Sequence, residues 1–335
     1  LHALAFQYAR YLLVASSRPG TLPATLQGIW NDSLAPPWES KWTININTQM
    51  NYWLAEVGNL AECHQPLFDL LEAAREDGRR TAAAHYGASG FVAHHNLDVW
   101  GRTTPVDGAK WGLWPLGAAW LALHLWDHWA FGRDRDFLAT RAYPVMREAA
   151  TFVLDLLVPH PDYPELLVTV PSVSPENTYS PSPTAVGEGS EASGVASLCI
   201  APAMDSQIAR ELLARCIEAT AILGIDAAFR GRAASALSRL PADRIGPDGR
   251  LQEWLEPYPE AELGHRHLSH LFGVYPAAQV TPRATPALAM AARRSLDTRL
   301  AHGGGQTGWS RAWVAALAAR LGDGEGAHHH LTALL

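Results

Sequence analysis

The chain has 335 residues, with 26 lysines and arginines against 33 aspartates and glutamates, which gives a net charge of −7. This negative charge argues against nucleic acid as a partner, because such binding needs a basic face. Hydrophobic residues make up 48% and charged residues 18% of the sequence, which is the composition of an ordinary globular protein.

No apolar run reaches the roughly 18 residues that a membrane helix needs, so we expect no membrane partner. The apolar segment 114–126 is too short and is interrupted by His124. The chain begins at Leu1, and no basic segment followed by an apolar stretch stands near its start, so we recognise no signal peptide. We expect the N-terminus of a longer protein to be missing, which leaves the compartment open.

Most of the chain shows the periodicity of amphipathic helices, with apolar residues at i, i+3, i+4 and i+7. Glycine and proline mark many of the ends. The pattern predicts helices, in chain order, over residues 1–16, 48–75 (as two elements), 114–131, 134–157, 204–223, 227–240, 286–300 and 308–321. Strand-like stretches are short, at residues 90–93 and 166–170. Successive helical pairs predict an all-α fold.

Three cysteines, Cys63, Cys199 and Cys216, lie inside apolar helical patterns without C-x-x-C spacing, which predicts buried, reduced thiols. The chain also contains 13 tryptophans. The flat apolar face and single N–H donor of tryptophan suit stacking against a sugar ring. Core packing is the commoner role, so a tryptophan is informative only beside polar loop residues.

Two long segments interrupt the helical pattern, residues 19–47 and 171–194. Loops of more than about 15 residues without secondary structure are uncommon in compact domains, and they are usually functional. Both segments carry the most unusual local sequences in the chain. We therefore expect them to contribute to a functional site.

The first segment leads into a run of side-chain amides. Asn45 and Asn47 stand two residues apart, and in an extended segment their side chains lie on one face. Two amides on one face can hold a water molecule by donating and accepting hydrogen bonds. A helix cap or a turn is the commoner role of an asparagine here. The nearby Trp30, Trp38 and Trp53 favour the functional interpretation.

The second segment contains P-S-V-S-P-E-N at residues 171–177, which places one carboxylate, Glu176, on a proline-stiffened loop. A general acid needs a fixed position and a raised pKa, and a rigid, partly apolar loop can give both. A solvent-exposed glutamate in a turn is the alternative interpretation.

Two further polar clusters stand outside these loops. The sequence H-R-H-L-S-H at residues 265–270 lacks the carboxylate or fourth ligand of familiar zinc patterns, so we predict no metal site. Binding of sugar hydroxyls and structural hydrogen bonding both stay open for it. The sequence H-H-N-L-D-V-W at residues 94–100 suits a sugar site or a polar turn with its own hydrogen bonds.

The chain shows no serine hydrolase, dinucleotide-binding or kinase motif, and we expect no cofactor. A helical protein whose loops gather asparagine, glutamine, histidine, glutamate and tryptophan fits oligosaccharide binding and hydrolysis.

Several motifs together resemble glycoside hydrolase family 95, the α-1,2-L-fucosidases. They are L-Q-G-I-W-N at residues 26–31, T-I-N-I-N-T-Q-M-N-Y-W at 43–53, S-P-E-N at 174–177, H-R-H-L-S-H at 265–270 and T-G-W-S at 307–310. They follow the order of the family from the first residue to the last. The resemblance implies one truncated catalytic domain over residues 1–335, without the family's N-terminal and C-terminal β-domains. It further implies an (α/α)6 barrel of the six-hairpin type that is incomplete at the C-terminus.

The resemblance also implies roles for individual residues. Glu176 resembles the general acid that protonates the glycosidic oxygen, and Asn45 and Asn47 resemble the amides that hold the attacking water. The implied mechanism is inversion, in which the water attacks the opposite face of the sugar. The residues implied to contact the substrate are Thr43, His95, Asn96, Asp98, Trp100, Arg266 and His267.

Two departures from the family pattern bear on activity and substrate. The family's base-partner aspartate belongs to a motif expected beyond Leu335, so we expect the 335-residue chain by itself to be inactive. Thr43 stands where similar fucosidases can carry a histidine that meets the sugar. A smaller threonine leaves room for a hydroxymethyl group, so the expected partner is a fucosylated or L-galactosylated glycan.

Two other functions compete with this interpretation. One is another carbohydrate enzyme on the same barrel, such as a phosphorylase or a lyase. Phosphate-dependent turnover identifies the first, and an unsaturated product that absorbs ultraviolet light identifies the second. The other is a non-catalytic sugar-binding or scaffold protein.

Overall fold

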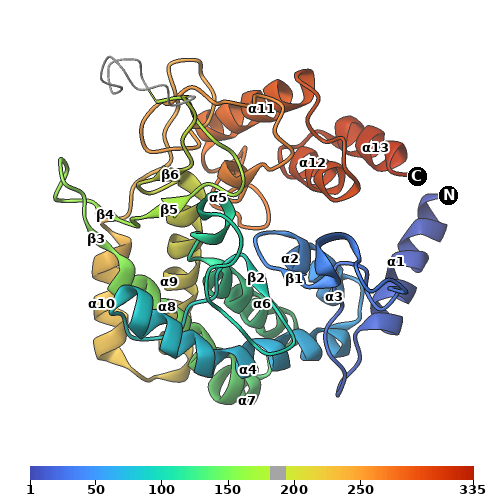
Figure 1. The fold of residues 1–335 in the computed structure, drawn as a ribbon, viewed down its shortest axis with the longest axis horizontal. Helices are drawn as coiled ribbons and strands as arrows, with labels where there is room; N and C mark the ends of the chain where they lie inside the picture. The colour runs from blue at the N-terminus through green and yellow to red at the C-terminus, as the bar shows by residue number, and fades with distance from the viewer. Residues whose placement is uncertain (182–193) are drawn as a thin grey trace. The chain divides into compact units, whose positions relative to one another are not determined.

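The computed structural model describes residues 1–181 and 194–335 (Figure 1). Residues 182–193, which belong to the predicted loop 171–194, lie outside this description. The chain forms two compact units. Unit 1 comprises residues 1–108, 112–157 and 209–239, and unit 2 comprises residues 109–111, 158–208 and 240–335.

Unit 1 is built mainly from helices joined by loops and short turns. Its elements are α1 (His2–Ser16), η1 (Pro37–Ser40), β1 (Trp42–Thr43), α2 (Asn47–Tyr52), α3 (Leu54–Val57), η2 (Ala61–His64), α4 (Gln65–Thr81), η3 (Ala82–Tyr86), β2 (Asn96–Leu97), α6 (Gly117–Gly132), α7 (Arg135–Phe137), η4 (Leu138–Ala142), α8 (Tyr143–Leu156) and α10 (Ala227–Leu237). The helix α9 (Ala203–Leu223) begins in unit 2 and continues into unit 1.

Helix α6 is the centre of the core of unit 1. It is apolar around most of its circumference and packs against both α4 and α8. Gly117, its first residue, allows another segment to come very close. A Cβ atom there would lie 2.4 Å from the carbonyl oxygen of His94 and 2.6 Å from the Cδ1 atom of Ile44. Because glycine has no side chain, the segments around residues 44 and 94 can pack directly against the start of α6.

Unit 2 combines short two-stranded ladders, a long irregular stretch and three consecutive helices. Its elements are α5 (Ala109–Gly112, whose last residue belongs to unit 1), β3 (Val158–Pro159), β4 (Leu167–Val168), β5 (Ser172–Val173), β6 (Leu198–Cys199), η6 (Ser269–Leu271), α11 (Pro286–Ala301), α12 (Gly308–Arg320) and α13 (Gly324–Ala333). Strand β5 pairs antiparallel with β6, which anchors the start of the loop that carries Glu176. Helix α13 packs against α12 (Figure 1).

The structure is mostly helical, which confirms the predicted class, and most predicted helices appear close to their predicted bounds. The segment 48–75 is more divided than predicted, because a break at Gly58 and the left-handed Asn59 separates α3 from η2. The strand predicted at residues 90–93 is wrong. Phe91, Val92 and Ala93 are fully buried in a loop, and the amide of Val92 donates to the carbonyl of Gly78 on α4.

The three cysteines are buried and free, as predicted. Eleven of the 13 tryptophans are either buried or exposed, and Trp53 and Trp309 are intermediate. Core tryptophans are Trp42, Trp114, Trp120, Trp126, Trp129, Trp254 and Trp313, while exposed ones are Trp30, Trp38, Trp100 and Trp111. Three of the four exposed rings therefore lie in the polar segments where a sugar-stacking role is of interest. Among the described helices, none is both long and apolar enough to span a membrane.

Candidate active site

The carboxylate of Glu176 in unit 2 lies against two basic side chains. Its Oε2 atom accepts a hydrogen bond from an Arg266 guanidinium N–H at 2.8 Å, and it lies 3.4 Å from His267 Nε2. The Glu176 side chain is 14% exposed, so it is largely shielded but still reachable. Residues 90 positions apart in sequence thus meet, and this part of the site contains three of the predicted residues.

The segment that carries Arg266 and His267 is held from several sides. The Ser310 hydroxyl on α12 donates to the carbonyl of Arg266 at 2.7 Å. The His267 ring contacts the Trp309 indole edge-on, with ring centroids 4.8 Å apart. On the other side, the Ser269 hydroxyl donates to the carbonyl of Pro175. The predicted motifs at residues 174–177, 265–270 and 307–310 therefore form one contiguous group in unit 2.

His265 and His270 have different surroundings from His267. Burial, together with the neighbouring His267, Arg299 and Arg266, lowers the pKa of His265 to about 2. Burial also lowers the pKa of His270 to about 3, with Arg299 adding to the effect. Both rings are therefore neutral at ordinary pH. This arrangement favours structural hydrogen bonding for these two histidines.

In unit 1, the amides Asn45 and Asn47 flank the entry to helix α2. Thr43 ends strand β1, where it pairs with Asn96 of β2, and a turn covers residues 44–46. Asn45 is 1% exposed, whereas Asn47 is half-buried and is the first residue of α2. The extended conformation assumed for Asn45 and Asn47 is therefore wrong, because the strand ends at Thr43. Their placement follows from the turn and the helix start instead.

The turn between β1 and α2 is fastened to its neighbours through the backbone. The Ile44 amide donates to the carbonyl of His95 at 2.7 Å, and the Gln49 side chain donates to the carbonyl of Ile44 at 2.6 Å. These bonds hold the amide-rich turn beside the polar segment that begins at His94. The structure thus brings Thr43, Asn45 and Asn96 into one small region of unit 1.

The polar segment 94–100 contains residues of two kinds. His95 Nε2 lies 2.6 Å from Asn96 Nδ2 and 3.2 Å from the Asp107 carboxylate, and both His95 and Asn96 are buried. Asp98, by contrast, accepts hydrogen bonds from the amides of Trp100 and Arg102 at 2.9 and 3.1 Å. Its carboxylate therefore serves a local turn, and the Trp100 ring stands 81% exposed beside it.

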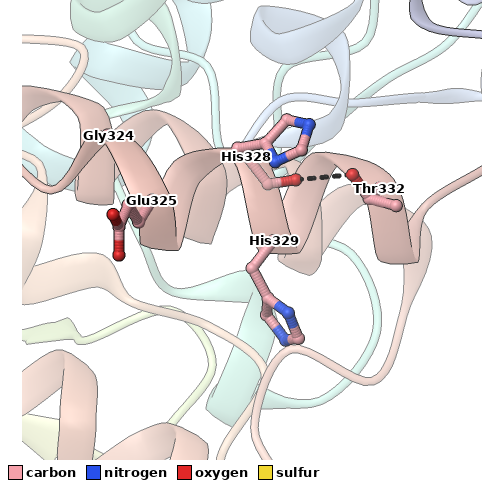
Figure 2. A pocket seen from close by; sticks show the side chains of 5 residues that line it. All are labelled: Gly324, Glu325, His328, His329 and Thr332. Carbon is pink, nitrogen blue, oxygen red and sulfur yellow. Dashed lines mark hydrogen bonds between the residues drawn. The ribbon is translucent and has the colours of Figure 1, made fainter.

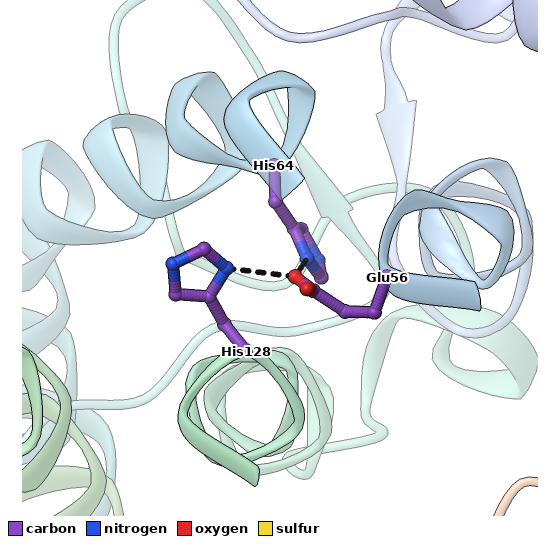
Figure 3. A group of neighbouring side chains, drawn as sticks. All are labelled: Glu56, His64 and His128. Atoms are coloured by element: carbon purple, nitrogen blue, oxygen red, sulfur yellow. Dashed lines mark hydrogen bonds and ion pairs between the residues drawn. The ribbon is translucent and has the colours of Figure 1, made fainter. Parts of the chain in front are cut away.

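A close group of Glu56, His64 and His128 in unit 1, of which His64 is buried, was not predicted from the sequence. Figure 3 shows both rings pointing at the carboxylate. The His64 and His128 Nδ1 atoms donate to Glu56 Oε1 at 2.8 and 2.7 Å, and His64 Nε2 lies 3.0 Å from His124 Nδ1. The three ligand-type atoms are close enough together to hold a metal ion. They are already hydrogen-bonded to one another, however, which favours a structural network.

This network predicts that the protein loses stability in acid. Burial lowers the pKa of His64 and of His124 below 6.5, so the unfolded chain binds protons that the folded chain excludes. Burial alone raises the pKa of Glu56, but hydrogen bonds from His128 and His64 lower it from 4.5 to about 2. The histidine contribution is lost as pH falls below 6.5, and the Glu56 contribution as pH falls below 4.5. Thermal melts from pH 8 to pH 4 measure the histidine part of this decline.

The matched pair of variants for this experiment is His124→Gln and His85→Gln. His124 is buried, whereas His85 is exposed on η3. We expect His124→Gln to flatten the fall in melting temperature between pH 7 and 5, and His85→Gln to leave it unchanged. Equal slopes in both variants contradict the assignment.

A surface hollow of about 610 Å³ lies along helix α13, lined by Gly324, Glu325, His328, His329 and Thr332. Figure 2 shows the His328 and His329 rings on different sides of the helix. The Thr332 hydroxyl donates to the carbonyl of His328 at 2.8 Å, which is an ordinary bond along a helix. None of the predicted site residues lines this hollow.

The supporting residues behind Glu176 were also missed by the sequence prediction. Ser174 and Asn177 flank Glu176, and both donate to the buried carboxylate of Glu253. Glu253 stands in the sequence Q-E-W at residues 252–254, which attracts notice only as another polar and aromatic mixture. The signal that could have identified it is a glutamate placed among the large apolar residues Leu251, Trp254 and Leu255, because a carboxylate that they bury needs partners.

The chain is mostly helical and places a shielded carboxylate beside an arginine and an imidazole. It also carries an amide-rich turn. These side chains are typical of carbohydrate-processing enzymes. The model of the family described as Glycosyl hydrolase family 95 catalytic domain matches residues 1–335. The chain therefore belongs to this family, as its motifs predict.

Curated relatives agree with this assignment. Alpha-L-fucosidase 2 of Arabidopsis thaliana is 43% identical over 331 residues, which cover 98% of this chain and 38% of that protein. A protein of Aspergillus niger named "Probable alpha-fucosidase A" is 33% identical over 340 residues, covering 98% of this chain and 41% of that protein. The chain thus spans about two fifths of the length of these relatives.

Among solved structures, a kojibiose phosphorylase candidate from the human microbiome matches with a TM-score of 0.63. The match covers 97% of this chain and 46% of that one, at 8% sequence identity. At this level of identity the likeness concerns the fold alone.

Proposed function

We propose that the protein carrying this chain is an inverting glycoside hydrolase that removes terminal α-L-fucosyl residues from glycans. Family membership supports the hydrolysis of a glycosidic bond, and the Arabidopsis thaliana relative supports fucose as the sugar. The observation that carries the proposal is the shielded Glu176 carboxylate on its fixed loop, 2.8 Å from Arg266 and 3.4 Å from His267.

In this proposal Glu176 is the general acid, which protonates the departing glycosidic oxygen. An arginine contact favours an ionised carboxylate, whereas the acid has to carry a proton when the bond breaks. This conflict is resolved if Arg266 turns from Glu176 to a sugar oxygen when substrate binds. The 38% exposure of the Arg266 side chain leaves it free to do so. Arg266 and His267 are thus proposed to bind the fucose ring.

Asn45 and Asn47 are proposed to hold the water that attacks the anomeric carbon, and the proton of this water is proposed to pass to the base-partner aspartate that the family resemblance implies. Each side-chain amide offers one acceptor and two N–H donors, so two amides can orient a water through both its hydrogens and its lone pairs. Their different exposures suit this role, because the buried Asn45 is fixed by its surroundings and the half-buried Asn47 can reach solvent. The remaining proposed substrate contacts in this unit are Thr43, His95, Asn96, Asp98 and Trp100.

We further propose that the helical pairs form part of an (α/α)6 barrel. The support is the mostly helical structure, the family assignment and the TM-score of 0.63 to a phosphorylase-type chain. Inversion is supported by the same residue types, namely a carboxylic acid together with amides suited to a water rather than a second carboxylate suited to covalent attack.

Thr43 bears on the choice between fucose and L-galactose, which differ by one hydroxyl. Thr43 is half-buried at the end of β1, next to Asn96 in the ladder. A short side chain there leaves space for a hydroxymethyl group. A site that merely accommodates an added hydroxyl discriminates by only about 10²-fold. We therefore expect the L-galactoside to be turned over as well.

The experiment is to incubate the full-length protein with an α-1,2-fucosylated oligosaccharide and with the matching α-L-galactoside. Proton NMR at early times identifies the first anomer released, and we expect the β-anomer. Release rates for the two sugars give the preference. Early release of the α-anomer contradicts inversion. A sugar phosphate formed only with added phosphate points instead to a phosphorylase, and no release of either sugar contradicts the proposed substrate.

A further inference from the structure

The loop that carries Glu176 is fastened on both sides of that residue to one buried carboxylate. The Ser174 hydroxyl donates to Glu253 Oε1 at 2.7 Å. The Asn177 side-chain N–H donates to Glu253 Oε2 at 3.0 Å. Ser174 and Asn177 are both 1% exposed, and Glu253 is 4% exposed. Residues 174 and 177 are thus tied to the same point, and Glu176 lies between them.

Glu253 also lies against a buried guanidinium group and against the ring of His270, whose Nδ1 is 3.6 Å from Glu253 Oε2. Arg299 of α11 donates to Glu253 Oε2 at 2.6 Å and is itself 2% exposed. Arg299 also donates to Glu260, and Arg250 donates to the other oxygen of Glu260 at 2.5 Å. Two carboxylates and two guanidinium groups therefore face one another here, and Arg250 also donates to the half-exposed Asp248 at 2.7 Å. A buried charge needs this kind of pairing to be tolerated.

Asn177 joins the two carboxylates of this group. Its side-chain N–H2 donates to Glu253 at 3.0 Å and to Glu260 at 3.2 Å, while its Oδ1 accepts from the amide of Thr178 at 2.9 Å. Both donors and one acceptor position of the amide are therefore used. An Asn177 fixed in this way cannot rotate independently of the charge group.

We propose that Glu253, held by Arg299, is a positioning residue that sets the location of the Glu176 carboxylate relative to the bond being cleaved. This inference rests on the proposed function, because it takes Glu176 to be the general acid. Glu253 acts through Ser174 and Asn177. It accepts hydrogen bonds from both and thereby removes the freedom of the intervening residues. Positioning matters because a displacement of about 1 Å can cost about 100-fold in rate.

Glutamine at position 253 is the sharpest test, because it keeps the shape and removes the charge. One oxygen of the carboxylate becomes an N–H2 group, which then faces N–H donors from Asn177 or Arg299. We expect Glu253→Gln to lower kcat on a fucosylated oligosaccharide by about 10- to 100-fold with little change in KM. Glu253→Asp keeps the charge and is expected to recover part of this loss. Glu256→Gln, at a half-buried carboxylate in the same segment, is the matched control with unchanged kcat.

A substrate whose leaving group needs no proton separates positioning of the acid from general damage. On α-L-fucosyl fluoride, Glu253→Gln is expected to approach the wild-type rate. An equal loss on both substrates shows a merely structural role and overturns the proposal, as does a wild-type rate on the oligosaccharide. If Glu253→Gln does not fold, Ser174→Ala removes one of the two loop hydrogen bonds to Glu253. Asn177→Ala removes the other, together with the contacts of Asn177 to Glu260 and Thr178. Both variants are assayed with the same two substrates.

The Glu176→Gln variant keeps this test distinct from the test of the proposed function. If Glu176→Gln turns over the oligosaccharide normally, the assignment of the acid fails. If Glu176→Gln loses turnover while Glu253→Gln and the two loop variants keep it, only the positioning proposal fails.

Discussion

Replacement of Glu176 by glutamine is expected to lower turnover of an α-L-fucosylated oligosaccharide by about 10²- to 10⁴-fold, which is the usual contribution of a general acid. The physical reason is that the departing sugar oxygen leaves as an alkoxide unless a proton reaches it. Glutamine keeps the shape and the contact to Arg266 but has no proton of suitable acidity to give. The measurement is kcat with the oligosaccharide in the full-length protein.

Two comparisons make this result specific. Fluoride leaves without a proton, so Glu176→Gln should retain most of its turnover of α-L-fucosyl fluoride. Glu262→Gln, at an exposed carboxylate in the same unit, should leave both activities near wild type. Normal oligosaccharide turnover by Glu176→Gln contradicts the proposed role. An equal loss on the two substrates means that Glu176 acts otherwise than as an acid.

Replacement of Asn47 by alanine is expected to lower kcat by about 10²-fold, because a water that has lost a hydrogen-bond partner spends less time in line for attack. Asn47 is the better choice for this test than Asn45. It is half-buried at the first residue of α2, whereas Asn45 is 1% exposed and its removal opens a void in the interior. The measurement is again kcat on the fucosylated oligosaccharide, with the melting temperature recorded alongside.

Azide provides the diagnostic for the water-holding role. Azide attacks without losing a proton, so it forms the bond to the anomeric carbon while Glu176 gives its proton to the departing oxygen. We expect added azide to raise turnover of Asn47→Ala and to yield the β-fucosyl azide. The control is Asn51→Ala, one turn later on the same helix, where the amide donates to the carbonyl of Thr25 at 3.2 Å. Asn47→Ala with a normal kcat contradicts the assignment.

Local properties of the sequence were sufficient to predict most of the helices. The segments 286–300 and 308–321 became α11 and α12 because signals that act within a few residues mark them. Both have periodic apolar residues and a glycine shortly after the end, and α11 also begins with a proline. The pattern at residues 90–93 failed for the opposite reason. Small and apolar residues there resemble a strand, but the adjoining helix α4 supplies the hydrogen-bond acceptor at Gly78. That partner is visible only in three dimensions.

The residues of the candidate site also divide into those that a local motif identifies and those that only the fold brings together. The motif at residues 174–177 identified Glu176, but nothing local indicated that Arg266 lies against it or that Glu253 supports its loop. These contacts join residues 90 and 79 positions apart. The close group around Glu56 is similar, since His64 and His128 come from different elements and no short motif connects them.

The absence of a side chain at Gly117 has a consequence for how sequences of this family can vary. The carbonyl of His94 and the side chain of Ile44 both rest where a Cβ would stand, so any larger residue displaces two segments at once. A mutational library that randomises residues around positions 43–47 and 94–98 should therefore hold position 117 constant. The effect on activity of a substitution in one of these segments should also depend on the residues present in the other. The two segments should evolve as a linked pair.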